Sequence, residues 1–383
     1  MKYFDLRRTA STSLALAATL LAAACGGGGG SGGGGGLPLT PIVVAPTAPT
    51  SPNTAEPGNT GNPGTPPDSG TPDSESYTVS LLAGSNTQTE GFEDGTGEAA
   101  KFSCPTAIAN GPNFSLVVAD GAGTGKHRIR TIEQGTVATQ LLYNANGSVI
   151  SGIMVDPIGR YIVSSPDNTY VSAFSPDGKT EERWGVGKLM GPSGAVLGAN
   201  GDYIVADAGD LKIKTLNPTN DSVTTFVGSI KGDADGSGSN AQFKYPKAIA
   251  IDATGNTYVA DPEGHTIRKI STLGEVSTLA GSGTAGHADG QGKYALLSAP
   301  VAVAVGPKGD IFFAERGSHT IRKISASGFV STIAGVAFDS GATNGLGNKA
   351  KFRDPEGLAV TSNGTIYVAD CGNHQIRKLR PSS

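Results

Sequence analysis

Cysteine and charged residues are scarce in this chain of 383 residues. Its 3 cysteines are too few for a small scaffold held together by many disulfides. Charged residues make up only 16% of the chain, whereas 57 residues are glycine and 23 are proline, a composition that excludes a coiled coil or a helical bundle. The 29 basic residues are outnumbered by 33 acidic residues, which excludes a strongly cationic nucleic-acid-binding protein.

Several short catalytic motifs are missing as well. The chain contains no H-E-x-x-H zinc motif, no phosphate-binding P-loop and no paired C-x-x-C. The long apolar run near the N-terminus, residues 14–24, is too short to cross a bilayer as a helix.

That run has the layout of an export signal. Lys2, Arg7 and Arg8 precede it and Cys25 follows it, which predicts a secretory signal peptide over residues 1–25. The segment 21–25 resembles the cleavage box of bacterial lipoproteins, in which the cysteine is lipidated and becomes the mature N-terminus. The alternative is an ordinary A-x-A cleavage site that uses the two alanines before the cysteine.

Residues 26–76 are expected to be a disordered tether. Two runs of five glycines are followed by a tract rich in Pro, Thr and Ser, and such a composition buries little apolar surface. If Cys25 is lipidated, this tether would hold a folded domain away from a membrane. The residue after the cysteine is Gly26 and not Asp, which by enterobacterial sorting habits implies the outer membrane.

Residues 77–383 are built from one repeated unit of four short segments. The second segment of each unit is rich in Val, Ile and Ala and usually ends in an acid, and these ends recur every 42 to 55 residues or so. The second segments end at Asp120, Ser165, Asp207, Asp261, Glu315 and Asp370. The third segments, mostly basic, cover 127–132, 169–174, 212–216, 265–270, 319–324 and 374–379. First segments follow a proline, as in 300–305, and fourth segments end in Gly, as in 276–281.

Each segment has the composition of a β-strand bounded by turn residues. Short turns make neighbouring strands antiparallel, so six copies of four strands predict an all-β, six-bladed propeller of four-stranded antiparallel blades. The last unit lacks its fourth strand, while residues 78–84 form a fourth strand without a unit of their own. We therefore expect the N-terminal strand to complete the last blade and close the ring, which removes an exposed edge.

The units resemble NHL repeats, with Gly372–Asn373–His374–Gln375–Ile376–Arg377 as the best match. This resemblance implies a six-bladed propeller that serves as a binding platform. Some members bind proteins, some bind RNA, and some act as sensor domains outside bacterial membranes. A few related propellers are metal-dependent lactonases or lyases, so the fold by itself does not choose a function.

Antiparallel alternation places two kinds of connection on one rim: the turns between second and third strands, and the links between units. We call this the link rim. The acids that end the second strands ring it, and they suit either a site for a cation or basic peptide or the capping of backbone N–H groups in their turns. Their repetition favours capping. These acids are Asp120, Asp207, Asp261, Glu315 and Asp370.

A second candidate set lies where the first strands begin, next to the axis. Its mixed polar character predicts a recognition surface and not a catalytic constellation. The set comprises Thr106, Ser151, Ser193, Lys247, Val301 and Glu356. The links before units 1, 4, 5 and 6 are longer than those before units 2 and 3, so one side of the link rim should be higher.

Metal sites find weaker support in the sequence. His127, His265, His319 and His374 head third strands, one per unit, and are too dispersed to share a zinc ion. Asp233 and Asp235 begin a partial calcium loop, but its twelfth position is lysine, so calcium is kept only as a weak alternative and no cofactor is assigned.

Cys104 and Cys371 are predicted to form a disulfide. With Cys25 lipidated, these two thiols remain in an oxidising compartment, and alternation places both on the link rim at the seam between the first and last blades. The alternative is a pair of buried free thiols.

The sequence thus favours an exported, lipid-anchored propeller, on the outer membrane, that binds a protein or peptide partner. Its only membrane contact would be the anchor. The repeat region holds 26 basic and 28 acidic residues, so no nucleic-acid partner is expected. The alternatives are a metal-dependent lactonase or lyase and a purely structural envelope protein.

Overall fold

The computed structural model describes residues 75–121, 127–143 and 149–382. The expected signal peptide, Cys25 and almost all of the tether lie outside these residues. Within the described part, no helix has the length and apolar character needed to span a membrane.

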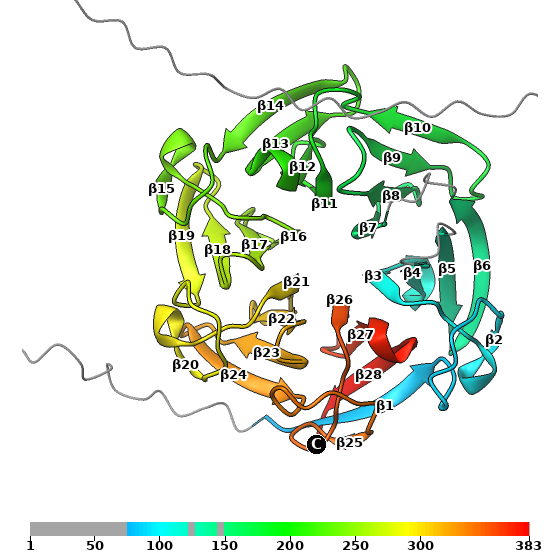
Figure 1. Cartoon of the computed structure of the whole chain (residues 1–383). Helices are drawn as coiled ribbons and strands as arrows, with labels where there is room; N and C mark the ends of the chain where they lie inside the picture. The colour runs from blue at the N-terminus through cyan, green and yellow to red at the C-terminus, as the bar shows by residue number, and fades with distance from the viewer. Residues whose placement is uncertain (1–74, 122–126, 144–148, 383) are drawn as a thin grey trace, which may run out of the picture. The chain divides into compact units, whose positions relative to one another are not determined.

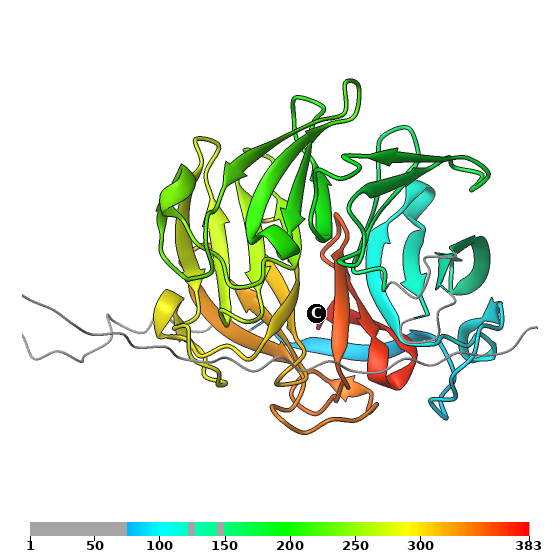
Figure 2. The ribbon, with the colours of Figure 1, turned by 45° about the horizontal axis from the view of Figure 1, so that its top comes forward.

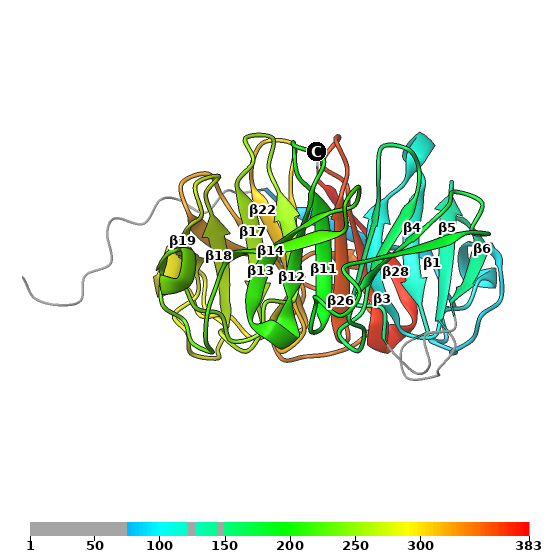
Figure 3. The same ribbon diagram turned by 90° about the horizontal axis from the view of Figure 1, so that it is seen from above.

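The chain folds as a six-bladed β-propeller, as predicted (Figure 1). Six antiparallel sheets surround a central axis, and each blade runs outward from an inner strand to an outer strand. Seen edge-on, the turns gather along two opposite rims (Figure 3).

The blades follow chain order. Blade 1 contains β3 (Pro105–Asn110), β4 (Leu116–Asp120), β5 (His127–Glu133) and β6 (Thr136–Tyr143). Blade 2 contains β7 (Gly152–Val155), β8 (Tyr161–Ser164), β9 (Val171–Phe174) and β10 (Glu181–Trp184). Blade 3 contains β11 (Pro192–Leu197), β12 (Tyr203–Asp207), β13 (Lys212–Asn217) and β14 (Ser222–Val227).

The second half repeats this order. Blade 4 contains β16 (Ala248–Ile251), β17 (Thr257–Asp261), β18 (Thr266–Ile270) and β19 (Glu275–Ala280). Blade 5 contains β21 (Pro300–Val305), β22 (Ile311–Glu315), β23 (Thr320–Ile324) and β24 (Phe329–Ala334). Blade 6 contains β26 (Pro355–Val360), β27 (Ile366–Asp370), β28 (Gln375–Pro381) and β1 (Tyr77–Ala83).

Four blades carry a fifth strand that the sequence did not predict. It is a two-residue segment of the link, and it pairs with the outer strand of the blade that the link enters. These strands are β2 (Gly95–Thr96) in blade 1, β15 (Gly236–Ser237) in blade 4, β20 (Gly290–Gln291) in blade 5 and β25 (Gly345–Leu346) in blade 6. Blades 2 and 3, which have short links, show no such strand among the described residues.

Short 3₁₀ turns complete the described structure. Three of them follow the fifth strands: η1 (Gly97–Ala99), η4 (Gly238–Asn240) and η5 (Gly292–Tyr294). The others are η2 (Pro112–Phe114), η3 (Ala208–Asp210) and η6 (Cys371–Asn373).

The N-terminal strand closes the ring, as predicted. β1 pairs antiparallel with β28 from Tyr77↔Pro381 to Ala83↔Ile376. Figures 1 and 2 show β1, in blue, beside the red β28.

The hydrophobic core lies between the blades. Tyr77 of β1 belongs to one buried cluster with Phe312 of blade 5 and Leu358 of blade 6. Alternation along each strand turns one row of apolar residues toward each neighbouring blade. Every blade therefore depends on both neighbours for burial, and an open ring would expose two such faces.

This dependence predicts the effect of removing β1. Deletion of residues 77–85 should expose the β28 edge and one face of the blade 5 core, so we expect aggregation and loss of a cooperative unfolding transition. Thermal unfolding followed by circular dichroism, together with size-exclusion chromatography, measures both effects. A soluble deletion variant with an unchanged melting temperature would show that β1 is not needed for closure.

Candidate functional site

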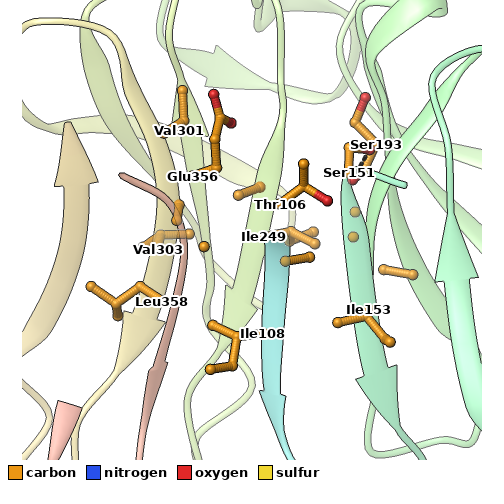
Figure 4. Close-up of a pocket in the computed structure, with 17 residues that line it drawn as sticks. Thr106, Ile108, Ser151, Ile153, Ser193, Ile249, Val301, Val303, Glu356 and Leu358 are labelled. Atoms are coloured by element: carbon orange, nitrogen blue, oxygen red, sulfur yellow. Dashed lines mark hydrogen bonds between the residues drawn. The ribbon is translucent and has the colours of Figure 1, made fainter. Parts of the chain in front are cut away.

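The inner strands surround an axial channel that is polar at the link rim and apolar further in. Figure 4 shows Thr106, Ser151, Ser193, Val301 and Glu356 at one level of this channel, with an apolar level below them. The two levels are two residues apart on each strand, because alternate residues of a strand share one face. The apolar level shown there comprises Ile108, Ile153, Ile249, Val303 and Leu358.

Glycines allow the inner strands to approach one another closely at the axis. A Cβ on Gly357 of blade 6 would lie 2.9 Å from the Cα of Ala107 in blade 1, which is closer than side chains tolerate. The channel is consequently narrow, with a cavity of only about 80 Å³.

The hydroxyl groups of the predicted axial set bond to backbone carbonyls, and two of them reach the next blade or the link that enters it. Thr106 Oγ1 donates to the carbonyl of Ile150 at 2.6 Å, and Ser151 Oγ donates to the carbonyl of Ser193 at 2.7 Å. The Ser193 side chain is itself fully buried. These hydroxyls join blades 1, 2 and 3 around the axis.

Charge gathers where the channel opens at the link rim. Lys247 of blade 4 forms an ion pair with Glu356 of blade 6, and Arg316 of blade 5 approaches the same carboxylate at 3.2 Å. Lys247 and Glu356 are largely buried, whereas the Arg316 side chain is 51% exposed. We call the cavity of about 240 Å³ around these residues the axial mouth; it is lined by Cys104, Thr106, Val149, Ser151, Lys247, Arg316, Glu356 and Cys371.

Arg316 was missed by the sequence analysis. It directly follows the acid Glu315 at the end of a second strand, and the matching positions in other units hold small or apolar residues. A charged residue at a position where the other units have small or apolar residues was the signal that could have identified Arg316. The structure brings four of the predicted axial residues to the mouth: Thr106, Ser151, Lys247 and Glu356.

Cys104 and Cys371 form a disulfide in the structure, with their Cα atoms 4.0 Å apart. The bond joins the start of blade 1 to the turn after β27 in blade 6. It therefore crosses the seam that β1 closes on the outside of the ring, and it also forms part of the wall of the axial mouth.

The acids at the ends of the second strands lie away from the mouth. All five are at most 1% exposed. Each accepts a backbone N–H from the link that enters its own blade: Asp120 from Ser103, Asp207 from Met190, Asp261 from Lys244 and Tyr245, Glu315 from Ser298, and Asp370 from Arg353. The bonded N–H groups thus come mainly from the link, whereas the capping interpretation expected them in the turn after the acid. Asp261 also makes a bond of the expected kind, because it accepts the N–H of Gly264 in its own turn at 3.1 Å.

The basic residues of the third strands are buried beside these acids. In blade 1, Arg130 is fully buried and bonds to Asp120 at 3.0 Å, to Asp94 of the link at 2.8 Å, and to the carbonyls of Lys101 and Glu93. Arg268, Arg322 and Arg377 occupy the same place in blades 4, 5 and 6 and are also fully buried. These four guanidinium groups are thus engaged in holding the links.

Burial and these hydrogen-bond partners shift the pKa values of the acids in opposite directions. Burial raises the pKa of Asp120 and of Asp370 to about 6, against the opposing effects of Arg130 and Arg377. Burial also acts to raise the pKa of Glu315, but His287, Arg322 and the Ser318 hydroxyl outweigh it and hold that pKa below its usual value.

A family model described as NHL repeat matches residues 352–379. The chain carries an NHL repeat. The matched residues cover β26, β27 and most of β28 in blade 6, which confirms the predicted resemblance.

Curated relatives match part of the chain at modest identity. The chain is 28% identical over 306 residues to Protein SUPPRESSOR OF QUENCHING 1, chloroplastic, from Arabidopsis thaliana, which covers 76% of the chain and 26% of the relative. It is 28% identical over 202 residues to NHL repeat-containing protein 2 from Homo sapiens, covering 46% of the chain and 28% of the relative. The chain thus spans only about a quarter of the length of these relatives.

Solved structures share the fold. An auxiliary nutrient binding protein from Bacteroides thetaiotaomicron superposes with a TM-score of 0.66 and 20% identity, covering 81% of this chain and 77% of that one. A virginiamycin B lyase from Staphylococcus aureus superposes with a TM-score of 0.53 and 15% identity, covering 80% of this chain and 100% of that one. At these identities the likeness shows the propeller fold alone.

The histidines of the NHL-type units hold neighbouring blades together. His374 Nδ1 accepts the N–H of Cys104 at 3.0 Å, His265 Nδ1 that of Ala299 at 3.1 Å, and His319 Nδ1 that of Asp354 at 3.2 Å. Each acceptor belongs to one blade and each donor precedes the first strand of the next. His127 makes no such bond to the described residues.

The remaining metal candidates are also engaged. Asp233 pairs with Lys244 at 2.9 Å, and Asp235 pairs with Arg268 at 2.7 Å. Across the described residues, no group of three or more His, Cys, Asp or Glu side chains is placed to hold a metal ion. The axial residues do not fit a divalent metal, because their one carboxylate, Glu356, is neutralised by Lys247 and Arg316.

The His374 bond predicts a pH dependence of stability. Because Nδ1 accepts a hydrogen bond, this nitrogen carries no proton, and burial lowers the pKa of His374 below its usual value. The unfolded chain therefore takes up the proton first as pH falls, and the contribution of His374 is complete above about pH 6.5 and is lost as pH falls through the folded pKa.

The matched variant is His374→Asn, because asparagine tolerates the left-handed backbone (φ 56°) and does not titrate. We expect the stability advantage of the wild type over this variant, measured by urea unfolding, to shrink as pH falls from about 7 to about 5. A difference that stays constant over this range would contradict the assignment.

Proposed function

We propose that this protein is a lipid-anchored propeller outside the cytoplasm that binds a protein or peptide partner at the axial mouth. The observation that carries the proposal is the pairing of Glu356 with Lys247 and Arg316 beside an open cavity. Three blades each contribute one of these residues, so the grouping exists only in the closed ring.

The charges at the mouth favour a carboxylate as the group that is recognised. Two cations surround one carboxylate, which leaves a net positive charge, and Arg316 presents half of its side chain to solvent. Arginine is enriched where protein interfaces bind most strongly, because its planar guanidinium group matches a carboxylate in two-point contact. An acidic side chain or the C-terminal carboxylate of a partner has this chemistry.

The comparisons support a binding role in general terms only. One structural neighbour is named an auxiliary nutrient binding protein, and another is named a virginiamycin B lyase. The enzymatic alternative, a metal-dependent lactonase or lyase, needs free ligands at the axis, whereas the axial hydroxyls bond to backbone and the axial carboxylate is paired. We therefore favour binding over catalysis.

Photo-cross-linking tests the mouth directly. We expect p-benzoylphenylalanine at Val149, which lines the mouth, to capture one discrete partner in intact cells. The same probe at Lys179, an exposed position in the turn between β9 and β10 on the opposite rim, serves as the control.

Arg316→Gln should then lower the cross-linking yield from position 149 about 10-fold, because a hydrogen bond to a charged group contributes about 1.5–3 kcal/mol. Equal capture from both positions, or a yield that does not respond to Arg316→Gln, would count against the mouth as the binding site.

The anchor is tested separately from the mouth. If Cys25 is lipidated, the mature protein should fractionate with membranes, and Cys25→Ser should release it or leave it unprocessed. Membrane fractionation of the two forms, followed by immunoblotting, measures this. A processed Cys25→Ser protein that still fractionates with membranes would contradict lipid anchoring.

A further inference from the structure

The outer edges of the blades differ in a way that points to a second binding surface. In blades 1, 4, 5 and 6 the link lays a short strand along the outer strand and satisfies part of its edge. The link segments that do this share the pattern Asp/Asn-Gly-X-Gly: residues 94–97, 235–238, 289–292 and 344–347.

The acid of this segment recognises a threonine on the outer strand. Asp94 accepts hydrogen bonds from the N–H and the hydroxyl of Thr139 in β6, both at 2.9 Å. Asp289 makes the same two contacts with Thr332 in blade 5, and Asp235 accepts the hydroxyl of Thr278 in blade 4. In blades 1, 4 and 5, therefore, the outer strand binds an extended segment in which an aspartate precedes glycine.

Blade 3 keeps the receiving strand but lacks the segment. Thr225 of β14 pairs with Lys214, in the same register in which Thr278 pairs with Arg268. Thr224 and Thr225 are exposed, and the Thr225 hydroxyl has no hydrogen bond to a described residue. No short strand lies on β14 within the described ranges 75–121, 127–143 and 149–382.

The link that enters blade 3 is short because it lacks only the segment that pairs with the outer strand in blades 1, 4, 5 and 6. Its retained end makes the usual contacts: Met190 N–H with Asp207, and the Lys188 carbonyl with Lys214. These match the bonds of Lys244 N–H with Asp261 and of the Gln242 carbonyl with Arg268 in blade 4. What is missing is the stretch that would cover the β14 edge.

The outer edge of blade 2, on which no described residue forms a fifth strand, is protected by charge. β10 of blade 2 has Glu181, Glu182 and Arg183 along its short length, and Arg183 stands where the outer strands of blades 1, 3, 4 and 5 have threonine. Charged side chains on an edge strand discourage strand addition. The β14 edge, with the sequence Ser-Val-Thr-Thr-Phe-Val, has no such protection.

We propose that the β14 edge binds an extended segment of a partner protein in which an acidic residue precedes glycine, as in the chain's own Asp-Gly-X-Gly links. The segment adds antiparallel to β14, and its carboxylate accepts hydrogen bonds from the N–H and hydroxyl of Thr225. A second copy of this chain is not the occupant, because its described segments of this kind are already paired within their own blades. The site is independent of the axial mouth.

A peptide from the chain's own link serves as the probe. We expect the fluorescently labelled peptide 233–243 (DADGSGSNAQF) to bind the purified full-length protein saturably in fluorescence polarisation. Thr225→Val keeps the strand propensity and removes the hydroxyl, so it should weaken binding about 10-fold, since a hydrogen bond to a charged group is lost. The matched control is Thr278→Val, whose hydroxyl already bonds to Asp235 within the chain and should leave peptide binding unchanged.

Two further measurements locate the interaction. Replacing the peptide's third residue, the counterpart of Asp235, by asparagine should weaken binding to the wild type but not to Thr225→Val. Bound peptide should also protect the amides of residues 222–227 from hydrogen exchange.

Absence of saturable binding, equal affinity for wild type and Thr225→Val, or protection on a different blade would each overturn the proposal. Sedimentation of the protein alone tests whether a second copy of the chain occupies the β14 edge. If the protein forms concentration-dependent dimers and Thr225→Val abolishes them, the occupant is a second copy and not a partner segment.

Discussion

The structure depends on the burial of a guanidinium group in four of its six blades. A buried charge is stable only when it is paired and its hydrogen-bonding positions are filled. The two terminal nitrogens of Arg130 meet this requirement with Asp120 of its own blade and with Asp94 and two carbonyls of the link, and those of Arg268, Arg322 and Arg377 use their links similarly. The Nε atom of each of these arginines is buried without a hydrogen-bond partner among the described residues. Because the arginine takes its partners from the link, it also determines the course of the link.

This arrangement explains which polar residues are free to serve a function. The acids, arginines and three of the histidines that recur from blade to blade are consumed in joining strand to link and blade to blade. The charged residues at the axial mouth, Lys247, Arg316 and Glu356, and the disulfide beside them have no equivalents in the other units. In a repeat protein of this kind, residues that depart from the repeat are the better guide to a site.

The links also decide how the ring presents its outer surface. A long link covers the outer strand, whereas no described residue of the short links before blades 2 and 3 pairs with the outer edge of β10 or β14. Blade 3 replaces the buried arginine with Lys214, which bonds to Asp207, Asp210 and the Lys188 carbonyl and needs no acid from a longer link. The short link and the replacement of arginine by lysine in blade 3 are therefore connected, because the lysine does not need the acid that a longer link supplies.

The sequence by itself determined the all-β class, the six units, the closing role of β1 and the rim on which each connection lies. These properties follow from local strand composition and from alternation, which act over a few residues and recur six times. The same alternation also placed Cys104 and Cys371 on one rim, and the structure joins them in a disulfide.

Only the tertiary structure decided which polar groups meet. The N–H partners of Asp120 and Asp370 lie 17 residues earlier in the chain, and Arg316 reaches Glu356 across a blade boundary. The fifth strands depend in the same way on links that fold back across an outer edge. Such contacts are determined by the packing of whole blades around a closed axis, so a residue that departs from the repeat, such as Arg316, is visible in the sequence but its partner is not.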